Sequence, residues 1–210
     1  WTLPGSNSAF LMRVDGLTLQ NFRNYREQAV SFDPWCNVIF GENAEGKTNL
    51  LEAIVYLSCG RSHRARSDRE LIRFGEDAAR LTGNLFARDR DFVLEAELFR
   101  DRRRKLWVNR VPAKTGGAFS QVYNTVFFCP EDLFLIREGA AVRRKFMDNA
   151  LCQLRPRYAA ALADYTRAYD HKTRILRDWG DKPDLLSTLP EFNERLVRSG
   201  AVLIHYRAQF

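Results

Sequence analysis

The segment Gly41 to Thr48 reads Gly-Glu-Asn-Ala-Glu-Gly-Lys-Thr and matches the pattern glycine, any four residues, glycine, lysine, then serine or threonine. It follows the short apolar run Asn37 to Phe40, and it precedes leucine and isoleucine residues at helical spacing that continue to Gly60. The order predicts a strand, a glycine-rich turn and a helix. This is the context that a P-loop requires, and it places the chain among α/β proteins.

The residue types of this loop predict phosphate binding. Gly41 and Gly46 let the backbone fold so closely that its N–H groups face inward on phosphate oxygens, and the following helix adds the positive end of its dipole. Lys47 supplies a charge for the β and γ phosphates, and the hydroxyl of Thr48 is placed to bind Mg²⁺. The predicted nucleotide-binding residues of the loop are Gly41, Glu42, Asn43, Ala44, Glu45, Gly46, Lys47 and Thr48.

Two segments imitate further ATPase motifs. Leu57 to Gly60 is similar to a Leu-Ser-x-Gly signature, but it closes the helix that the P-loop opens, so Gly60 is predicted to be a helix C-cap. Val126 to Cys129 resembles a Walker B strand, but Pro130 separates it from the acidic pair that follows and shifts these carboxylates out of register. We predict a strand end and a short helix there, and we assign no catalytic residue.

Other strands follow from apolar runs and alternating patterns. In Asp91 to Phe99 the apolar residues occupy one face and the acidic residues the other, which is the period of a half-buried strand. The predicted strands are Val14–Phe22, Ala29–Phe32, Asn37–Phe40, Leu81–Phe86, Asp91–Phe99, Lys105–Val108 and Val122–Phe128.

The pattern becomes helical near residue 140. Residues 157–179 contain neither proline nor glycine, and Tyr158, Leu162, Tyr165, Tyr169, Lys172, Leu176 and Trp179 step by four and three, as in a heptad seam. A final helix over 191–210 should form an antiparallel hairpin with it. We therefore predict a leader or remnant at 1–11, the N-terminal part of a nucleotide-binding head at 12–140, and a helical arm at 141–210 that is truncated.

Composition limits the classes of partner. The 210 residues carry a formal net charge of +7 and the pI is about 9.5, which favours polyanionic partners. The four cysteines lie far apart, so the chain has neither a zinc-site spacing nor a dense disulfide framework, and a reducing cytosol is expected. No run reaches the roughly 18 apolar residues of a membrane helix, so no membrane partner is expected.

Four segments in order carry a family resemblance: Leu19–Tyr25 (Leu-Gln-Asn-Phe-Arg-Asn-Tyr), Gly41–Ile54, Gly60–Arg64 (Gly-Arg-Ser-His-Arg) and Pro130–Leu133 (Pro-Glu-Asp-Leu). Together they closely resemble the RecF family of bacterial recombination mediators. An Asn-Phe-Arg segment before a P-loop is shared with the wider SMC-like ATPases, whereas the last two segments are more particular to the RecF family.

The resemblance implies an ABC-type ATPase head with a mixed sheet around the P-loop helix, followed by an α-helical hairpin lobe. It implies ATP and Mg²⁺ as ligands, sequence-independent DNA binding at gaps or single/double-strand junctions, and an ATP-dependent homodimer in the full-length protein. It also implies cooperation with RecR and RecO in loading RecA in the bacterial cytoplasm. The Walker B and signature motifs of the family would lie in the other half of such a protein, so the whole is expected to be a slow DNA-dependent ATPase and this chain to be inactive.

Three single residues take roles from the resemblance. Arg23 and Asn24 match family positions beside the nucleotide, and a solvated strand end is the other interpretation of this pair. Glu131 falls where related ATPases place a metal-sensing loop whose usual residue is glutamine, which leaves its role open.

Basic clusters are candidates for DNA phosphates, because each neutralised phosphate adds salt-dependent affinity. A solvated surface is the other interpretation of each cluster. The residues predicted to contribute are Arg61, Arg64, Arg66, Arg143, Arg144 and Lys145. Two other functions stay open: an unrelated P-loop kinase, for which a heptad arm has no obvious use, and a non-enzymatic DNA-binding module with a vestigial P-loop, which nucleotide titration would separate.

Overall fold

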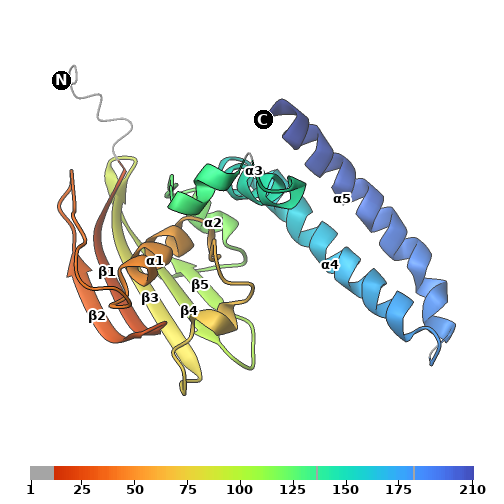
Figure 1. Cartoon of the computed structure of the whole chain (residues 1–210), viewed down its shortest axis with the longest axis horizontal. Helices are drawn as coiled ribbons and strands as arrows, with labels where there is room; N and C mark the ends of the chain where they lie inside the picture. The colour runs from red at the N-terminus through yellow and green to blue at the C-terminus, as the bar shows by residue number, and fades with distance from the viewer. Residues whose placement is uncertain (1–11, 136, 182) are drawn as a thin grey trace. The chain divides into compact units, whose positions relative to one another are not determined.

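The computed structural model of the chain divides into two compact units, of which the first ends at Phe127 and the second begins at Phe128 (Figure 1). Each unit is described by itself. The predicted leader at 1–11 lies outside the described part of the chain, and the predicted domain boundary near residue 140 stays a prediction. The structure describes residues 12–135, 137–181 and 183–210.

The first unit is built on a six-stranded sheet with the order β2-β1-β3-β4-β5-β6, in which every neighbouring pair is antiparallel. Helix α1 (Lys47–Cys59) lies across one face of this sheet (Figure 1). The strands are β1 (Arg13–Phe22), β2 (Tyr25–Ser31), β3 (Ala78–Ala87), β4 (Arg90–Phe99), β5 (Lys105–Val108) and β6 (Val111–Ala113).

The alternation seen in the sequence explains how these strands bury one face. In β4, Leu94, Ala96 and Leu98 are fully buried, while Glu95 and Glu97 lie on the opposite face. The expected pairing of β4 with β5 is confirmed by the register, and so is the pairing of β1 with β2.

Helix α1 covers the core through Ala53, Tyr56 and Leu57, which are all buried. It approaches the sheet closely at Gly83, where an added Cβ would lie 2.5 Å from Leu57 Cδ1. The helix ends at Gly60, whose φ of 67° and N–H bond to the Tyr56 carbonyl (2.7 Å) confirm the predicted C-cap. Two shorter helical segments complete this unit: η2 (Asp68–Leu71) and α2 (Gly117–Ser120).

Two predicted strands are wrong. Neither Asn37–Phe40 nor Val122–Phe128 forms a strand. Phe40 is 88% exposed and Val126 is fully exposed. A strand is stable only when a neighbour accepts its backbone hydrogen bonds, and no described strand lies beside either run. An apolar run therefore predicts a strand only where the fold also supplies a neighbouring strand.

The second unit is helical. Short segment η3 (Pro130–Phe134) agrees with the predicted short helix after Pro130, and the other elements are α3 (Ala140–Leu154), α4 (Pro156–Asp178), η4 (Pro183–Thr188) and α5 (Leu189–Gln209). Ring contact between Tyr158 and Tyr206 near one end, and a hydrogen bond from Lys172 Nζ to Asn193 Oδ1 (2.7 Å) further along, show that α4 and α5 run antiparallel. The predicted helical hairpin is therefore confirmed.

The seam of α4 differs from the predicted one in its second half. Tyr158 is buried as expected, but beyond Tyr165 the buried positions are Ala168 and Ile175. Tyr169 is 56% exposed. A straight α-helix has 3.6 residues per turn, so the buried stripe drifts away from a strict heptad in a short hairpin. Within the described residues, no helix has the length and apolar content needed to cross a membrane.

Candidate nucleotide-binding site

The loop before α1 has the backbone of a phosphate cradle. Three of its residues take positive φ angles: Gly41 (146°), Ala44 (69°) and Gly46 (110°). Gly46 is the N-cap of α1, and its carbonyl accepts the first helical bond from the Leu50 N–H (2.9 Å). Because the helix begins at Lys47, the unpaired N–H groups of its first turn and the positive end of its dipole lie at this loop.

The turn between β1 and β2 holds the loop from outside. Asn24 Nδ2 donates to the Glu45 carbonyl (2.9 Å), and the Tyr25 hydroxyl donates to the Gly46 carbonyl (3.1 Å). Asn49 Nδ2 in turn donates to Asn24 Oδ1 (2.8 Å). The predicted position of Asn24 beside the loop therefore has a structural basis, because its side chain spans from the loop to α1.

Lys47 and Thr48 differ in what they contact. Lys47 Nζ donates to the carbonyls of Gly41 (2.8 Å) and Glu42 (2.5 Å), so its ammonium group lies across the mouth of the loop. Thr48 is exposed, and its hydroxyl has no hydrogen bond to the described part of the chain. A lone hydroxyl suits Mg²⁺, which keeps several waters and is held largely by phosphate oxygens.

The loop also contains a carboxylate. Glu45 Oε2 accepts the backbone N–H of Glu42 (2.9 Å), one of the amides that the sequence assigns to phosphate. An anion bound in the loop would therefore meet a negative charge of the protein itself. The P-loop pattern assigns a role only to the backbone N–H of Glu45, so it does not predict this contact of the side chain.

Glu52 of α1 binds two arginines, Arg23 and Arg64, beside the loop. The sequence did not predict this role. The Glu52 carboxylate is fully buried in α1, and it accepts Arg23 Nε and Nη2 (2.9 Å each), Arg64 Nη2 (2.5 Å) and the Ser62 hydroxyl. Burial by itself raises the pKa of this carboxyl, but the hydrogen bonds from the two arginines and Ser62 outweigh it and hold the pKa at about 2. Glu52 is thus a permanent counter-ion for both guanidinium groups.

Arg23 therefore stands beside the loop in a different way from Asn24. Its guanidinium binds Glu52 and the Glu70 carbonyl (2.9 Å), so it links the β1–β2 turn to α1 and η2. The sequence alone does not predict this link, because Arg23, Glu52 and Arg64 belong to three separate segments of the chain.

The predicted DNA-binding residues fall into two groups. Arg61, Arg64 and Arg66 lie on the connection after α1, where Arg64 binds Glu52 and Asn49 and the Arg66 N–H donates to Glu70 (3.2 Å). The other three, Arg143, Arg144 and Lys145, lie on α3 in the second compact unit. Their part in DNA binding stays a prediction.

The basic run at residues 102–105, which follows β4, contains one residue, Arg104, that binds a buried hydroxyl. Arg104 Nη1 donates to the Tyr56 hydroxyl (3.2 Å) and to Asp68 Oδ2 (3.0 Å), beneath α1. Burial raises the pKa of the Tyr56 hydroxyl well above its ordinary value, so it stays a neutral hydrogen-bonding group. Arg104 is therefore half-buried, and its guanidinium is engaged with Tyr56 and Asp68.

The acidic pair after Pro130 does not extend a strand. Asp132 Oδ2 accepts the Cys129 N–H (2.9 Å) and caps the first turn of η3. This agrees with the predicted helix start. The side chain of Glu131 lies outside the described part of the structure, so its role stays open.

The cradle, the helix behind it and the antiparallel sheet define the fold class: an α/β P-loop head of the ABC-ATPase-like type. A solved structure described as coming from work on SMC ATPases shares this fold, with a TM-score of 0.51 at 22% identity over 65% of this chain and 98% of that one. A family model described as an AAA domain matches residues 16–117.

Closer relatives cover nearly the whole chain. The DNA replication and repair protein RecF of Agathobacter rectalis is 37% identical over 199 residues, which are 95% of this chain and 55% of that protein, and RecF of Bacillus cereus is 36% identical over 95% and 53%. A solved structure described as the recombination mediator protein RecF-ATP has a TM-score of 0.81 at 31% identity, over 98% of this chain and 56% of that one. The chain belongs to the RecF family, and it spans about half the length of the curated relatives it matches.

Proposed function

We propose that this chain binds ATP with Mg²⁺ in the loop before α1, as the nucleotide-binding part of a DNA repair and replication protein. One observation carries the proposal: the motif residues fold into a loop bent at three positive φ angles that ends at the first turn of α1, with Lys47 across its mouth. The similarity to a RecF structure described as an ATP complex supports the choice of nucleotide.

In this proposal the loop amides from Glu42 to Thr48 donate to the phosphate oxygens, and Lys47 exchanges its two carbonyl partners for the β and γ phosphates. Thr48 contributes one hydroxyl to Mg²⁺, and the phosphates and water supply the other ligands. Asn24 maintains the shape of the loop through the Glu45 carbonyl. Arg23, which Glu52 holds beside the loop, adds positive charge near the nucleotide.

The wider activity is proposed from the family. A protein of the relatives' full length would bind DNA, dimerise around ATP, hydrolyse it slowly when DNA is bound, and help RecR and RecO to load RecA at single-strand gaps in the bacterial cytoplasm. This chain contributes the cradle to that activity. We assign it no carboxylate that could orient the attacking water, since Asp132 is engaged in capping η3.

A nucleotide titration tests the proposal. Calorimetry of the 210-residue chain with Mg-ATP should give one site, and Lys47→Ala should weaken binding at least about tenfold, because it removes the cation at the β and γ phosphates. Lys105→Ala, which removes an exposed lysine of β5, is the matched control and should leave the affinity unchanged. Equal affinities of the wild type and Lys47→Ala would contradict the proposal.

Hydrolysis tests whether the chain carries a catalytic carboxylate. The chain alone should turn over ATP negligibly. Rapid hydrolysis that Asp132→Asn abolishes would show that this carboxylate has a catalytic part, and the account of the cradle as an isolated binding element would be wrong.

A further inference from the structure

The helical hairpin of α4 and α5 has two sides that differ in composition (Figure 1). On one side, polar and aromatic pairs join the two helices. Arg195 Nη2 donates to Asp164 Oδ1 (2.7 Å), and the ring of His171 stacks on Phe192 with 5.4 Å between the ring centroids. The side chains of this side are therefore engaged within the hairpin itself.

Other contacts join the helices on the opposite side. The ring of Tyr165 lies over Gly200, where an added Cβ would be 3.3 Å from Tyr165 Cε2, and Lys172 Nζ donates to Asn193 Oδ1 (2.7 Å). Tyr165 and Lys172 each come one position after a residue of the first side, which is a rotation of about 100° around α4. The two sets of contacts therefore border the seam of the hairpin from its two sides.

An exposed apolar residue follows each of these four residues, four positions later in the sequence. Residues four apart are neighbours on one face of a helix, so the exposed residues lie together on this side of the hairpin. They form the apolar flank, which consists of Tyr169, Leu176, Val197 and Ile204. Their side chains are 48% to 73% exposed. Single exposed apolar residues are common, but a row of them across two helices marks an interaction surface.

Small uncharged residues form the outer edge of the flank. Thr173, Ala201 and Ala208 each follow a flank residue by four positions, and all three are exposed. Although 28% of the chain is charged, the flank and this outer edge carry no charged side chain. Helices pack about 8 to 10 Å apart according to the side chains between them, so short side chains favour close approach. The surface therefore suits further helices.

A second copy of this chain fits the flank in charge and in shape. The chain carries a net charge of +7 and in general repels its copy, but two apolar flanks bring no like charges together. A two-fold axis places the same surface of both copies in contact. Two antiparallel helix pairs that meet in this way form a four-helix bundle.

The size of the flank also matches a dimer. Helix α4 has 23 residues and α5 has 21, so the hairpin is about 30 Å long. Two helices about 10 Å apart make it about 20 Å wide. Two copies can thus bury about 600 Å² each and about 1,200 Å² together, which is the lower end of the range for specific interfaces. An interface of this size predicts a reversible dimer.

We propose that two copies of this chain associate through the apolar flanks of their α4–α5 hairpins and form a reversible four-helix bundle without nucleotide. The inference goes beyond the proposed function, in which the homodimer depends on ATP. The flank lies entirely in the second unit, whereas the loop that is proposed to bind ATP belongs to the first.

Sedimentation equilibrium of the 210-residue chain without nucleotide tests the proposal. The weight-average mass should rise with concentration from 24.4 kDa toward twice that value. Val197→Glu and Ile204→Glu should each weaken the dimer at least about tenfold, because each would bury an unpaired charge. Ala160→Glu is the matched control, since Ala160 is exposed and lies four positions before Asp164 on the other side of the hairpin. It should keep the dissociation constant of the wild type.

Two further measurements exclude indirect effects. The substituted positions are exposed, so the variants should melt at the temperature of the wild type under dilute conditions in which all of them are monomeric. Ile204→Glu should also keep the Mg-ATP affinity of the wild type. A failure of the dimer and a failure of the proposed function are therefore distinguishable.

Three results would overturn the proposal. One is the mass of a single chain at every concentration up to about 100 μM. Another is a dimer that forms only with Mg-ATP or that both flank variants leave intact. The third is a protein of the relatives' full length that stays monomeric without nucleotide although the 210-residue chain dimerises, because the rest of that protein would then cover the flank.

Discussion

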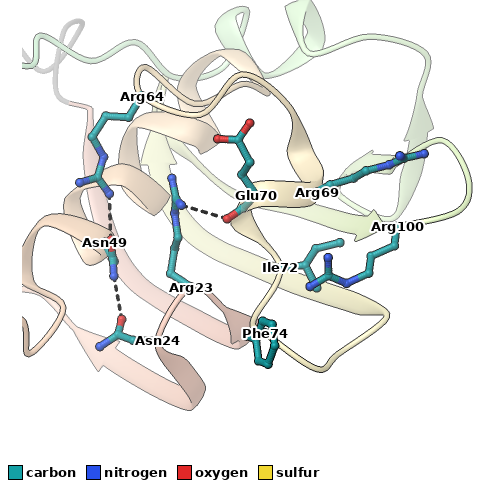
Figure 2. Close-up of a pocket in the computed structure, with 9 residues that line it drawn as sticks. All are labelled: Arg23, Asn24, Asn49, Arg64, Arg69, Glu70, Ile72, Phe74 and Arg100. Carbon is teal, nitrogen blue, oxygen red and sulfur yellow. Dashed lines mark hydrogen bonds between the residues drawn. The ribbon is translucent and has the colours of Figure 1, made fainter.

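The loop before α1 and the arginine pocket beside it, which is lined by Arg23, Arg64, Arg69 and Arg100 among others, are built in opposite ways (Figure 2). The loop uses the backbone of eight consecutive residues, whereas the pocket uses side chains from four separated segments of the chain. A carboxylate of the protein is bonded to each region. In the loop this is the exposed Glu45, and at the pocket it is the buried Glu52, which binds Arg23 and Arg64.

The comparison shows which substitutions each region can accept without loss of stability. A backbone cradle depends on local φ angles, so its charge can be changed at a surface side chain with little effect on the fold. A side-chain pocket depends on a counter-ion inside the core, so a change there acts on the stability of the whole unit. The predictions below separate these two behaviours.

The largest effect is expected at Glu52. Glu52→Ala leaves two arginines without their counter-ion beside the core, and it should lower the free energy of unfolding by about 3 to 5 kcal/mol. Urea denaturation measures the loss. Glu27→Ala, at an exposed position of β2, is the control and should cost less than about 0.5 kcal/mol. If Glu52→Ala lowers the free energy of unfolding by less than about 1 kcal/mol, the ion pairs of Glu52 with Arg23 and Arg64 do not stabilise this unit.

The same carboxylate predicts a pH dependence. Its pKa of about 2 lies below the ordinary 4.5, so the folded state binds this proton less tightly than the unfolded state does. The stabilisation is therefore complete above about pH 4.5 and is lost as the pH falls toward 2, by about 3 kcal/mol in all. Glu52→Gln cannot titrate, and its stability should approach that of the wild type at low pH. Parallel stability curves of the two proteins from pH 5 to pH 2 would contradict the assignment.

The smallest effect is expected at Glu45. Glu45→Gln keeps an acceptor for the Glu42 N–H and removes the negative charge from the loop. Because the side chain is exposed and solvent screens it, Mg-ATP affinity should rise only about two- to fivefold, with no change in melting temperature. Calorimetry of the variant measures this. A weaker affinity would mean that the carboxylate stabilises the binding shape of the loop and does not compete with phosphate.

The sequence predicted the loop well because its determinants are contiguous. Glycines at fixed spacing, a lysine and the following helical period all lie within Gly41 to Gly60, and the structure forms that turn and helix with the predicted C-cap. The alternation in β4 was predicted for the same reason, since period 2 is a local property.

The remaining features depend on residues far apart in the chain. Nothing near Glu52 indicates that Arg23 and Arg64 converge on it, because 29 and 12 positions separate them in the sequence. Asn37–Phe40 was predicted as a strand from its own composition, although a strand also needs a neighbour. The pocket, too, exists only after the fold brings its arginines together.

Backbone amide NMR of the 210-residue chain during a Mg-ATP titration tests the central claim most directly. The account predicts that the amides of residues 42–48 shift most and that Lys47→Ala suppresses the changes at the same nucleotide concentration. Loop amides that do not shift in the wild type at saturating Mg-ATP would contradict it.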